Sequence, residues 1–279
     1  MGILPPGGNY TAERLRFEDV DLPALNRRAL EDLRGNRIAM IFQDPMTSLN
    51  PVFTIGFQLK ETFVRHVERD GGKAMSLAVE LLEKVGISNA KERMNDYPHQ
   101  LSGGMRQRVM IAMALICNPR LLIADEPTTA LDVTIQLQIL ELLVELTREF
   151  GTGMLLITHD LGVVAHVANN VSVMYAGEVV ESGPVGDVLG EPTHPYTQAL
   201  LSCVPVPGGS KRGEHLGSIQ GIVPPLVGDL GGCHFRARCE RAQAACSGNA
   251  IPFHRIGKER GSRCVLAQSP AAAWTAQYA

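Results

Sequence analysis

Two adjacent carboxylates, Asp125 and Glu126, stand out as side chains placed for chemistry. They directly follow a short apolar run at residues 121–124, which predicts a buried parallel strand. At the carboxyl end of such a strand, the first carboxylate can hold Mg²⁺ and the second can orient or deprotonate an attacking water. The arrangement therefore predicts phosphate chemistry at one edge of a parallel sheet.

A Ser-Gly-Gly turn lies shortly before this strand, at Ser102, Gly103 and Gly104. Serine is a favourable N-cap residue, and the apolar stretch that follows predicts a helix ending near Asn118. The two glycines have no Cβ that would block a close ligand, and the first N–H groups of a helix stabilise an anion. The turn therefore predicts a phosphate contact at the start of this helix.

At these residues the chain resembles the ATP-binding subunits of ABC transporters. Residues 101–107, LSGGMRQ, resemble the signature motif, with Met105 where glutamine is commoner. Residues 121–126 resemble the Walker B strand with its catalytic glutamate, and residues 130–132, Ala-Leu-Asp, resemble the D-loop. The motifs occur in the family's order. The resemblance implies ATP and Mg²⁺ as cofactors.

Two further positions follow strand-like runs. Gln43 ends the run at residues 37–42, and by resemblance it is the glutamine that ligates Mg²⁺ and reports the nucleotide state to a membrane subunit. Residues 46–51, MTSLNP, resemble the continuation found in peptide and nickel importers. His159 follows residues 154–157, which predict another buried strand, and by resemblance it contacts the γ-phosphate.

The resemblance thus implies which residues carry out catalysis, which bind Mg²⁺ and which contact the nucleotide. Glu126 and His159 are the expected catalytic residues, and Asp125 and Gln43 are the expected Mg²⁺ ligands. Nucleotide contacts are expected from Gln43, Ser102, Gly103, Gly104, Gln107 and Asp132.

The expected fold is α/β: an ABC-type nucleotide-binding domain, with a parallel-sheet ATPase core, a helical subdomain and a small Cys-rich C-terminal extension. We expect the ATPase domain at residues 1–189, with the helical subdomain at about 51–118. A hairpin at residues 171–182 would close this domain. Residues 190–279 would form an extension of the type found in oligopeptide transporters, because residues 194–197 read His-Pro-Tyr-Thr.

Composition narrows the possible partners. The 279 residues are 45% hydrophobic and 20% charged, with a net charge of -3, so composition gives no support for nucleic-acid binding. No apolar run is long enough to span a bilayer, and the first residues lack the pattern of a signal peptide. We expect a peripheral protein at the cytoplasmic face of the membrane, held there by protein partners.

One motif of the family is missing from the sequence. No G-x-x-x-x-G-K-[ST] pattern, the Walker A motif or P-loop that cradles the β- and γ-phosphates, occurs in these residues. We therefore expect an N-terminally truncated sequence, whose native chain begins upstream of Met1 or which is itself a truncated product. As given, such a chain would be impaired, although its signature motif could still complete the site of an intact partner.

The resemblance also implies an assembly. A second ABC ATPase subunit would pair head to tail with this chain in a homodimer or heterodimer. Two transmembrane permease subunits would be driven by it, and an extracytoplasmic substrate-binding protein would act indirectly. The expected cargo is oligopeptides or dipeptides, with nickel as the alternative. An ABC ATPase without transport, acting in DNA repair or translation, and a non-catalytic fragment are further alternatives.

The last fifth of the chain contains four clustered cysteines: Cys233, Cys239, Cys246 and Cys264. In a cytosolic protein such a cluster favours a metal site over disulfides. Zinc ligands are usually paired two to four residues apart, and none of these gaps fits. A [4Fe–4S] cluster needs four cysteines and tolerates varied spacing between them. In the peptide-importer ATPases that this chain resembles, some members carry such a cluster at the matching segment. We expect [4Fe–4S], with zinc and unmetallated thiols as alternatives.

Overall fold

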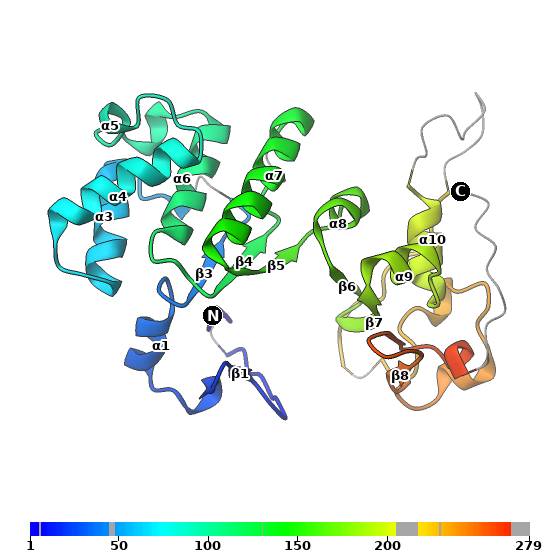
Figure 1. The fold of residues 1–279 in the computed structure, drawn as a ribbon. Coiled ribbons are helices and arrows are strands. Elements are labelled where there is room, and N and C mark those ends of the chain that lie inside the picture. Colours follow the sequence, from blue (N-terminus) through cyan, green and yellow to red (C-terminus); the bar gives the residue numbers. More distant parts are fainter. Residues whose placement is uncertain (6, 45–47, 130, 205–216, 229, 269–279) are drawn as a thin grey trace, which may run out of the picture. The chain divides into compact units, whose positions relative to one another are not determined.

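The computed structural model describes residues 1–5, 7–44, 48–129, 131–204, 217–228 and 230–268. The chain divides into two compact units, Met1–His159 and Asp160–Ala279, which are described separately below (Figure 1). The domain boundary expected after residue 189 stays a prediction. The division between compact units falls earlier in the chain, directly after His159.

The first unit contains the predicted parallel sheet. Its strands are β3 (Ile38–Ile41), β4 (Leu121–Asp125) and β5 (Gly153–Ile157), in the order β3-β4-β5. All three predicted strands are therefore confirmed, but the prediction that the third is buried was wrong. Its side chains Leu155 and Ile157 are 52% and 45% exposed, because β5 pairs only with β4 in the described part of the chain.

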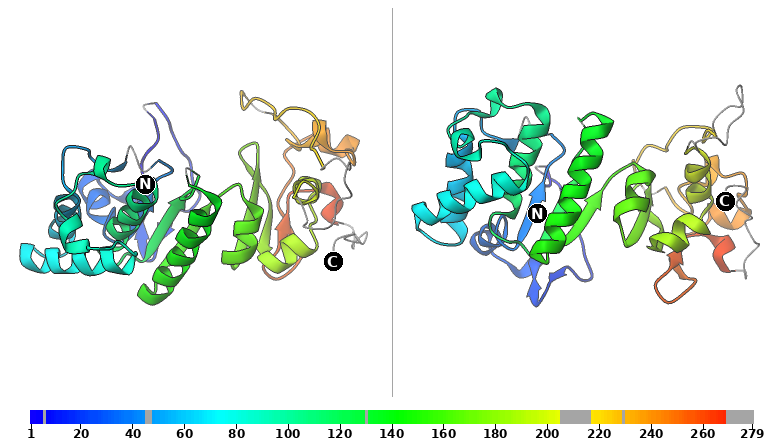
Figure 2. Two further views of the ribbon diagram at one scale, coloured as in Figure 1. Left: turned by 90° about the horizontal axis from the view of Figure 1, so that it is seen from above. Right: turned by 45° about the horizontal axis from the view of Figure 1, so that its top comes forward.

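Five helices of the first unit share one apolar core with this sheet. They are α3 (Ile55–His66), α4 (Gly71–Lys84), α5 (Ala90–Arg93), α6 (Gly103–Leu115) and α7 (Val133–Phe150). Leu59, Leu82 and Ile111 come from three different helices and are completely buried or nearly so. Figures 1 and 2 show α7 running alongside β4 and β5, and Ile139 and Leu143 of this helix belong to the same core as Leu122.

Short elements complete the first unit. They are β1 (Arg16–Phe17) and β2 (Val20–Asp21), which pair antiparallel, helix α1 (Arg27–Leu33), and 3₁₀ turns at Leu22–Ala24 and Pro98–Gln100. In the ranges that the structure describes, no helix combines the length and the apolar character needed to cross a membrane.

The second unit is built on an antiparallel sheet in the order β6-β7-β9-β8. The strands are β6 (Asn170–Tyr175), β7 (Glu178–Pro184), β8 (His254–Arg255) and β9 (Gly261–Ser262). The predicted hairpin is confirmed as β6 and β7, and Ala176 and Gly177 between them have φ angles of 46° and 81°. A two-residue hairpin turn of type I′ requires positive φ angles at both of its central residues.

Helices and turns cover this second sheet. They are α8 (Leu161–Val167), α9 (Val185–Gly190), α10 (Pro195–Ser202), and 3₁₀ turns at Arg236–Arg238, Ala244–Ser247 and Val265–Gln268. The core of this unit is aromatic: the Phe235 ring lies 5.1 Å from Tyr175 and 5.4 Å from Tyr196, measured between centroids. Residues of the C-terminal segment are thus packed into the same unit as the hairpin.

Candidate functional site

The side chain of Glu126 is the centre of a hydrogen-bonded cluster in the first unit. Its Oε2 accepts a hydrogen bond from Gln43 Nε2 at 2.7 Å and another from Thr129 Oγ1 at 2.8 Å. Its Oε1 lies 3.0 Å from His159 Nδ1. The structure therefore brings together Gln43, Glu126 and His159, three residues that the sequence predicted for one site. Thr129 is a partner that the sequence reasoning missed.

The parallel sheet explains why these residues meet. Gln43, Glu126 and His159 each follow the carboxyl end of a strand, and the three strands are neighbours. Glu126 donates its backbone N–H to the carbonyl of Ile157, and its φ angle of 43° lies in the left-handed region. For a residue other than glycine, that backbone conformation costs about 1–3 kcal/mol, so the surrounding structure must hold Glu126 in it.

The partners of Glu126 favour its charged form. The hydrogen bond from His159 is the largest cause that lowers the pKa of the Glu126 carboxyl, followed by that from Thr129, and Gln43 adds to the effect. Burial opposes this shift but does not cancel it. Glu126 is therefore a carboxylate at neutral pH, as a group that accepts a proton must be.

We expect His159→Ala to raise the pKa of Glu126 toward its ordinary value. The alanine variant removes the hydrogen bond that favours the carboxylate, so the proton binds at a higher pH than in the unchanged protein. Carbon NMR of labelled glutamate side chains would follow the titration. Replacement of the exposed His166 on α8 is the control and should leave the Glu126 titration unchanged. A Glu126 titration that stays the same in His159→Ala would contradict the assigned cause.

Asp125, which precedes Glu126, and Gln43, a member of the cluster, have the chemistry of Mg²⁺ ligands. Asp125 is the last residue of β4 and pairs with Ile157 in the ladder, directly before Glu126. Gln43 uses its amide nitrogen on Glu126, so its amide oxygen is the atom with which it can bind a cation. Carboxylate and amide oxygens are the donor set that Mg²⁺ prefers.

The predicted signature turn begins helix α6. Ser102 is its N-cap, and Ser102 Oγ accepts a hydrogen bond from the N–H of Met105 at 3.3 Å. A Cβ on Gly104 would lie 3.3 Å from Ile135 Cγ2, and one on Gly103 would lie 4.0 Å from Leu131 Cδ2. The absence of a Cβ at Gly104 thus eases a tight approach of α6 to Ile135, whereas a Cβ at Gly103 would make only an ordinary contact.

Two other predicted nucleotide contacts differ in their exposure. Gln107 is 1% exposed, and its Nε2 has no hydrogen-bond partner among the described residues, so its side chain cannot reach a ligand at the surface in this conformation. Asp132 is exposed at the start of α7 and makes no capping hydrogen bond with its side chain. Met46, Thr47 and Ala130, which belong to predicted motifs, lie outside the described residues.

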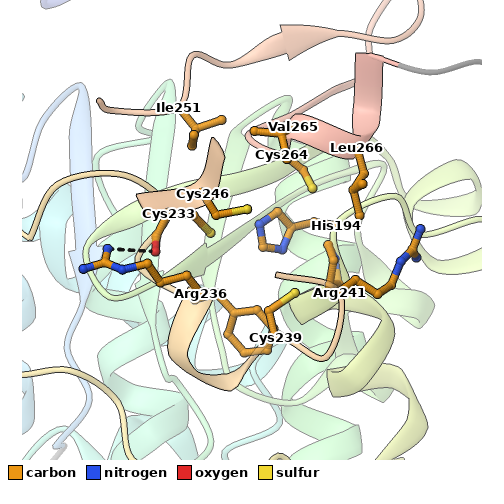
Figure 3. A pocket seen from close by; sticks show the side chains of 12 residues that line it. His194, Cys233, Arg236, Cys239, Arg241, Cys246, Ile251, Cys264, Val265 and Leu266 are labelled. Atoms are coloured by element: carbon orange, nitrogen blue, oxygen red, sulfur yellow. Dashed lines mark hydrogen bonds between the residues drawn. The ribbon is translucent and has the colours of Figure 1, made fainter. Parts of the chain in front are cut away.

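The four clustered cysteines line one pocket in the second unit. Cys233, Cys239, Cys246 and Cys264 share it with apolar side chains that include Ile251 and Leu266 (Figure 3). Burial raises the pKa of the thiols of Cys233, Cys239 and Cys264. No group of three or more His, Cys, Asp or Glu side chains in the described ranges has the geometry to hold a metal ion, so the predicted metal centre stays a prediction.

His194 is a pocket residue that the sequence reasoning treated only as part of a linker motif. It is 1% exposed, lies among the cysteines in Figure 3, and precedes helix α10 as its N-cap. Burial lowers the pKa of His194 to about 4, while a hydrogen bond with the backbone of Arg263 opposes this shift. The imidazole is therefore neutral at physiological pH. The only sign in the sequence was its place in the His-Pro-Tyr-Thr segment.

Solved structures of other proteins share this fold. The ATP-binding cassette MJ0796, in a dimeric post-hydrolysis state bound to ADP and Pi, is 29% identical and has a TM-score of 0.54 over 61% of this chain and 72% of its own. CbiO1 of Clostridium perfringens, part of an ABC transporter complex, is 29% identical with a TM-score of 0.55 over 64% and 68%. The parallel sheet, the Glu126 cluster and the capped signature helix thus define an ABC-type ATPase cassette.

Sequence comparisons narrow the class to a family. The ABC transporter family matches residues 6–129, and the family described as oligopeptide/dipeptide transporter, C-terminal region, matches residues 180–246. Oligopeptide transport ATP-binding protein AppD of Bacillus subtilis is 50% identical over 95% of this chain and 81% of its own length. Dipeptide transport ATP-binding protein DppD of Escherichia coli is 47% identical over 95% and 80%. The chain belongs to the ABC transporter ATP-binding proteins of the oligopeptide and dipeptide transport family.

Proposed function

We propose that this protein hydrolyses ATP to drive the uptake of oligopeptides or dipeptides by an ABC importer. The observation that carries the proposal is Glu126, an ionised carboxylate after the Walker B strand, bonded to Gln43, Thr129 and His159. The names of the relatives support a peptide cargo, and the match to the transporter C-terminal family supports the same branch.

The residues of the cluster have distinct tasks in this proposal. Glu126 orients the attacking water and accepts its proton, for which its lowered pKa keeps it ionised. His159, whose Nδ1 lies 3.0 Å from Glu126 Oε1, would contact the γ-phosphate. Asp125 and Gln43 hold Mg²⁺, which neutralises charge on the phosphates when it is bound.

We place this ATPase at the cytoplasmic face of the membrane as a peripheral subunit. It pairs head to tail with a second ATPase subunit, and Ser102, Gly103 and Gly104 at the start of α6 contact the ATP held by that partner. Two permease subunits respond to this pair, and an extracytoplasmic binding protein delivers the peptide. A dimeric arrangement is supported by the related cassette MJ0796, which was solved as a dimer.

Two substitutions at Ser102 separate its capping role from its ligand role. Ser102→Ala removes the N-cap bond to Met105 and should lower the unfolding free energy of the first unit by about 1 kcal/mol. Ser102→Asp keeps a capping oxygen but places a negative charge where the phosphate binds. We expect Ser102→Asp to fold normally and to abolish ATP-dependent association of the two ATPase subunits, measured by size-exclusion chromatography. Normal association of this variant would contradict the ligand role.

ATP hydrolysis by the complete importer tests the proposed function. The complex of both ATPase subunits and both permeases, purified from its native source, should release phosphate from Mg-ATP faster when the binding protein and a dipeptide are added. Nickel replaces the dipeptide in the matched control and should give no stimulation. A complex that hydrolyses no ATP, or one that nickel alone stimulates, would overturn the assignment.

We further propose that the four-cysteine pocket holds a [4Fe–4S] cluster. Four thiols face one apolar cavity, and a cluster uses wider spacing than a single ion, because each cysteine binds a different iron. The wider spacing of cluster ligands is compatible with the finding that no group of side chains in the described part of the chain could hold a single metal ion. When bound, the cluster would supply one-electron redox chemistry. Cys233, Cys239, Cys246 and Cys264 would hold it, and Arg236 and Arg241 beside the pocket would offset its negative charge.

Analysis of iron and acid-labile sulfide tests this second proposal. Protein purified without air should contain both in nearly equal amounts, with a broad visible absorbance. Cys246→Ser is the informative variant, because Cys246 is buried in the pocket, and Cys117→Ser is the control, because Cys117 packs in the first unit. Wild-type protein without iron and sulfide would overturn the cluster.

A further inference from the structure

Thr129 is the partner of Glu126 to which the proposed function gives no task of its own. Gln43 and His159 also contact the carboxylate, but Gln43 is expected to hold Mg²⁺ and His159 to contact the γ-phosphate. Thr129 Oγ1 donates a hydrogen bond to Glu126 Oε2 at 2.8 Å. Because the Thr129 side chain is exposed, packing in the apolar core does not account for it. The contact with Glu126 is the role that the structure gives to its hydroxyl.

A tight turn sets the hydrogen bond between Thr129 and Glu126. The backbone N–H of Thr129 donates to the Glu126 carbonyl at 3.3 Å, which closes a four-residue turn from Glu126 to Thr129. Pro127 is the second residue of this turn, a position that the fixed φ angle of proline favours. The side chains of Pro127 and Thr128 are buried and hold the turn in the fold. The hydroxyl donor therefore belongs to the same short segment as the carboxylate.

The other two partners of Glu126 belong to different segments of the sheet. Gln43 follows β3 and His159 follows β5, whereas Glu126 and Thr129 both follow β4. A shift of either neighbouring segment on nucleotide binding would change the contact of Gln43 or His159 with the carboxylate. Thr129 moves together with Glu126, so its hydrogen bond is the one that can persist while the other two partners engage Mg²⁺ and phosphate.

The two carboxylate oxygens of Glu126 have different surroundings. Oε2 accepts hydrogen bonds from Gln43 Nε2 at 2.7 Å and from Thr129 Oγ1 at 2.8 Å. A carboxylate oxygen has about two lone-pair sites, so these two donors occupy Oε2. Oε1 lies 3.0 Å from His159 Nδ1, and a single donor there leaves a lone pair for the proton of a water molecule. One oxygen is thus suited to anchor the side chain and the other to accept a proton.

We propose that Thr129 is a positioning residue for ATP hydrolysis, whose hydroxyl anchors Glu126 Oε2 so that Oε1 receives the proton of the attacking water. The inference rests on the proposed function and adds to it which oxygen acts as the base. As the water oxygen bonds to the γ-phosphorus, the bond from this phosphorus to the ADP oxygen breaks and one water proton moves to Oε1. Thr129 contacts neither the water nor the nucleotide in this step and acts through Glu126.

Two variants at this position separate the hydroxyl from the rest of the side chain. Thr129→Val keeps the branched shape but has no hydroxyl, whereas Thr129→Ser keeps the hydroxyl and loses the methyl group. Thr134 is exposed in the first turn of α7, and Thr134→Val is the matched control. Each variant is prepared in the complete importer, and phosphate release is measured over a range of Mg-ATP concentrations to obtain kcat and KM.

We expect Thr129→Val to lower kcat by about 10–100-fold, because a misplaced base slows proton transfer, and to leave the KM for Mg-ATP unchanged. Thr129→Ser and Thr134→Val should keep most of the wild-type kcat. A wild-type kcat in Thr129→Val, an equal loss in Thr129→Ser, or a raised KM with an unchanged kcat would overturn the positioning role.

A double variant tests whether Thr129 acts through Glu126. In the Glu126→Gln background, Thr129→Val should cause no further fall in kcat, because the base that Thr129 positions is already absent. A further fall as large as that in the wild-type background would show that Thr129 acts independently of Glu126 and would overturn the inference. A wild-type importer that hydrolyses no ATP would instead overturn the proposed function itself.

Discussion

Replacing Glu126 by Gln should lower the rate of ATP turnover by the importer by about 10²–10⁴-fold, the usual contribution of a general base. Glutamine keeps the size and most hydrogen bonds of the side chain, but its amide cannot accept the proton of the attacking water. The lowered pKa of Glu126 supports this role, because it keeps the carboxylate ionised at neutral pH. Phosphate release at saturating Mg-ATP measures the effect.

A matched control distinguishes this loss from a general effect of removing charge. Glu141 is an exposed carboxylate on α7, and Glu141→Gln should hydrolyse ATP at the wild-type rate. Glu126→Gln should still bind ATP, because the residues expected to contact the nucleotide are unchanged. If Glu126→Gln retained the turnover of Glu141→Gln, Glu126 would not be the catalytic base.

Removing Arg260 should destabilise the second unit by about 3–5 kcal/mol, the usual cost of breaking one side of a buried ion pair. Glu181 is 0% exposed, and Arg260 is its cationic partner among the described residues, at 3.2 Å. Arg260→Ala leaves that carboxylate charged and buried. Arg260 also donates to Thr193 Oγ1 and to the Glu191 carbonyl, and both bonds are lost. Amide hydrogen exchange of residues in the second unit measures its unfolding free energy.

The double variant Glu181→Gln/Arg260→Ala tests the reason for the loss. A neutral amide at position 181 leaves no buried charge, and its one oxygen can still accept from either the Thr193 or the His194 N–H group, so part of the stability should return. Arg27→Ala, which breaks an exposed pair with Glu31, should change stability by less than about 1 kcal/mol. A double variant no more stable than Arg260→Ala would show that the buried charge is not the cause.

Local sequence patterns were sufficient for the elements that position the ATPase cluster. Apolar runs ended by polar residues predicted the three parallel strands, and the Ser102 turn predicted the start of α6, because strand burial and helix capping depend on neighbouring residues. Once the strands were assigned, the meeting of Gln43, Glu126 and His159 followed from the geometry of parallel sheets.

Properties that depend on distant parts of the chain could not be predicted in this way. The exposure of Leu155 and Ile157 reflects the position of β5 at one side of the described sheet, which no local pattern encodes. Gln107 lies in a helix that is apolar on nearly every side, so the sequence could not indicate that its side chain points inward. Thr129 joins the site through the unusual backbone of Glu126.

The cysteines and His194 also show the difference between what a local sequence pattern predicts and what only the fold determines. Their number predicted a common site, but only the fold brings Cys264 and His194 into one pocket with the other three. Cys264 and His194 meet in this pocket because strand β9 pairs with β7, which places Ser262 opposite Glu181. The sequence distance between these segments is too great for any spacing rule.

ATP-dependent uptake of a labelled dipeptide tests the central claim most directly. The complete importer, purified from its native source, is reconstituted in vesicles with the binding protein, and Mg-ATP is supplied on the side of the ATPase subunits. Our account predicts that the wild-type complex accumulates the peptide and that the Glu126→Gln complex does not. Equal accumulation by the two complexes, or none by the wild type, would contradict it.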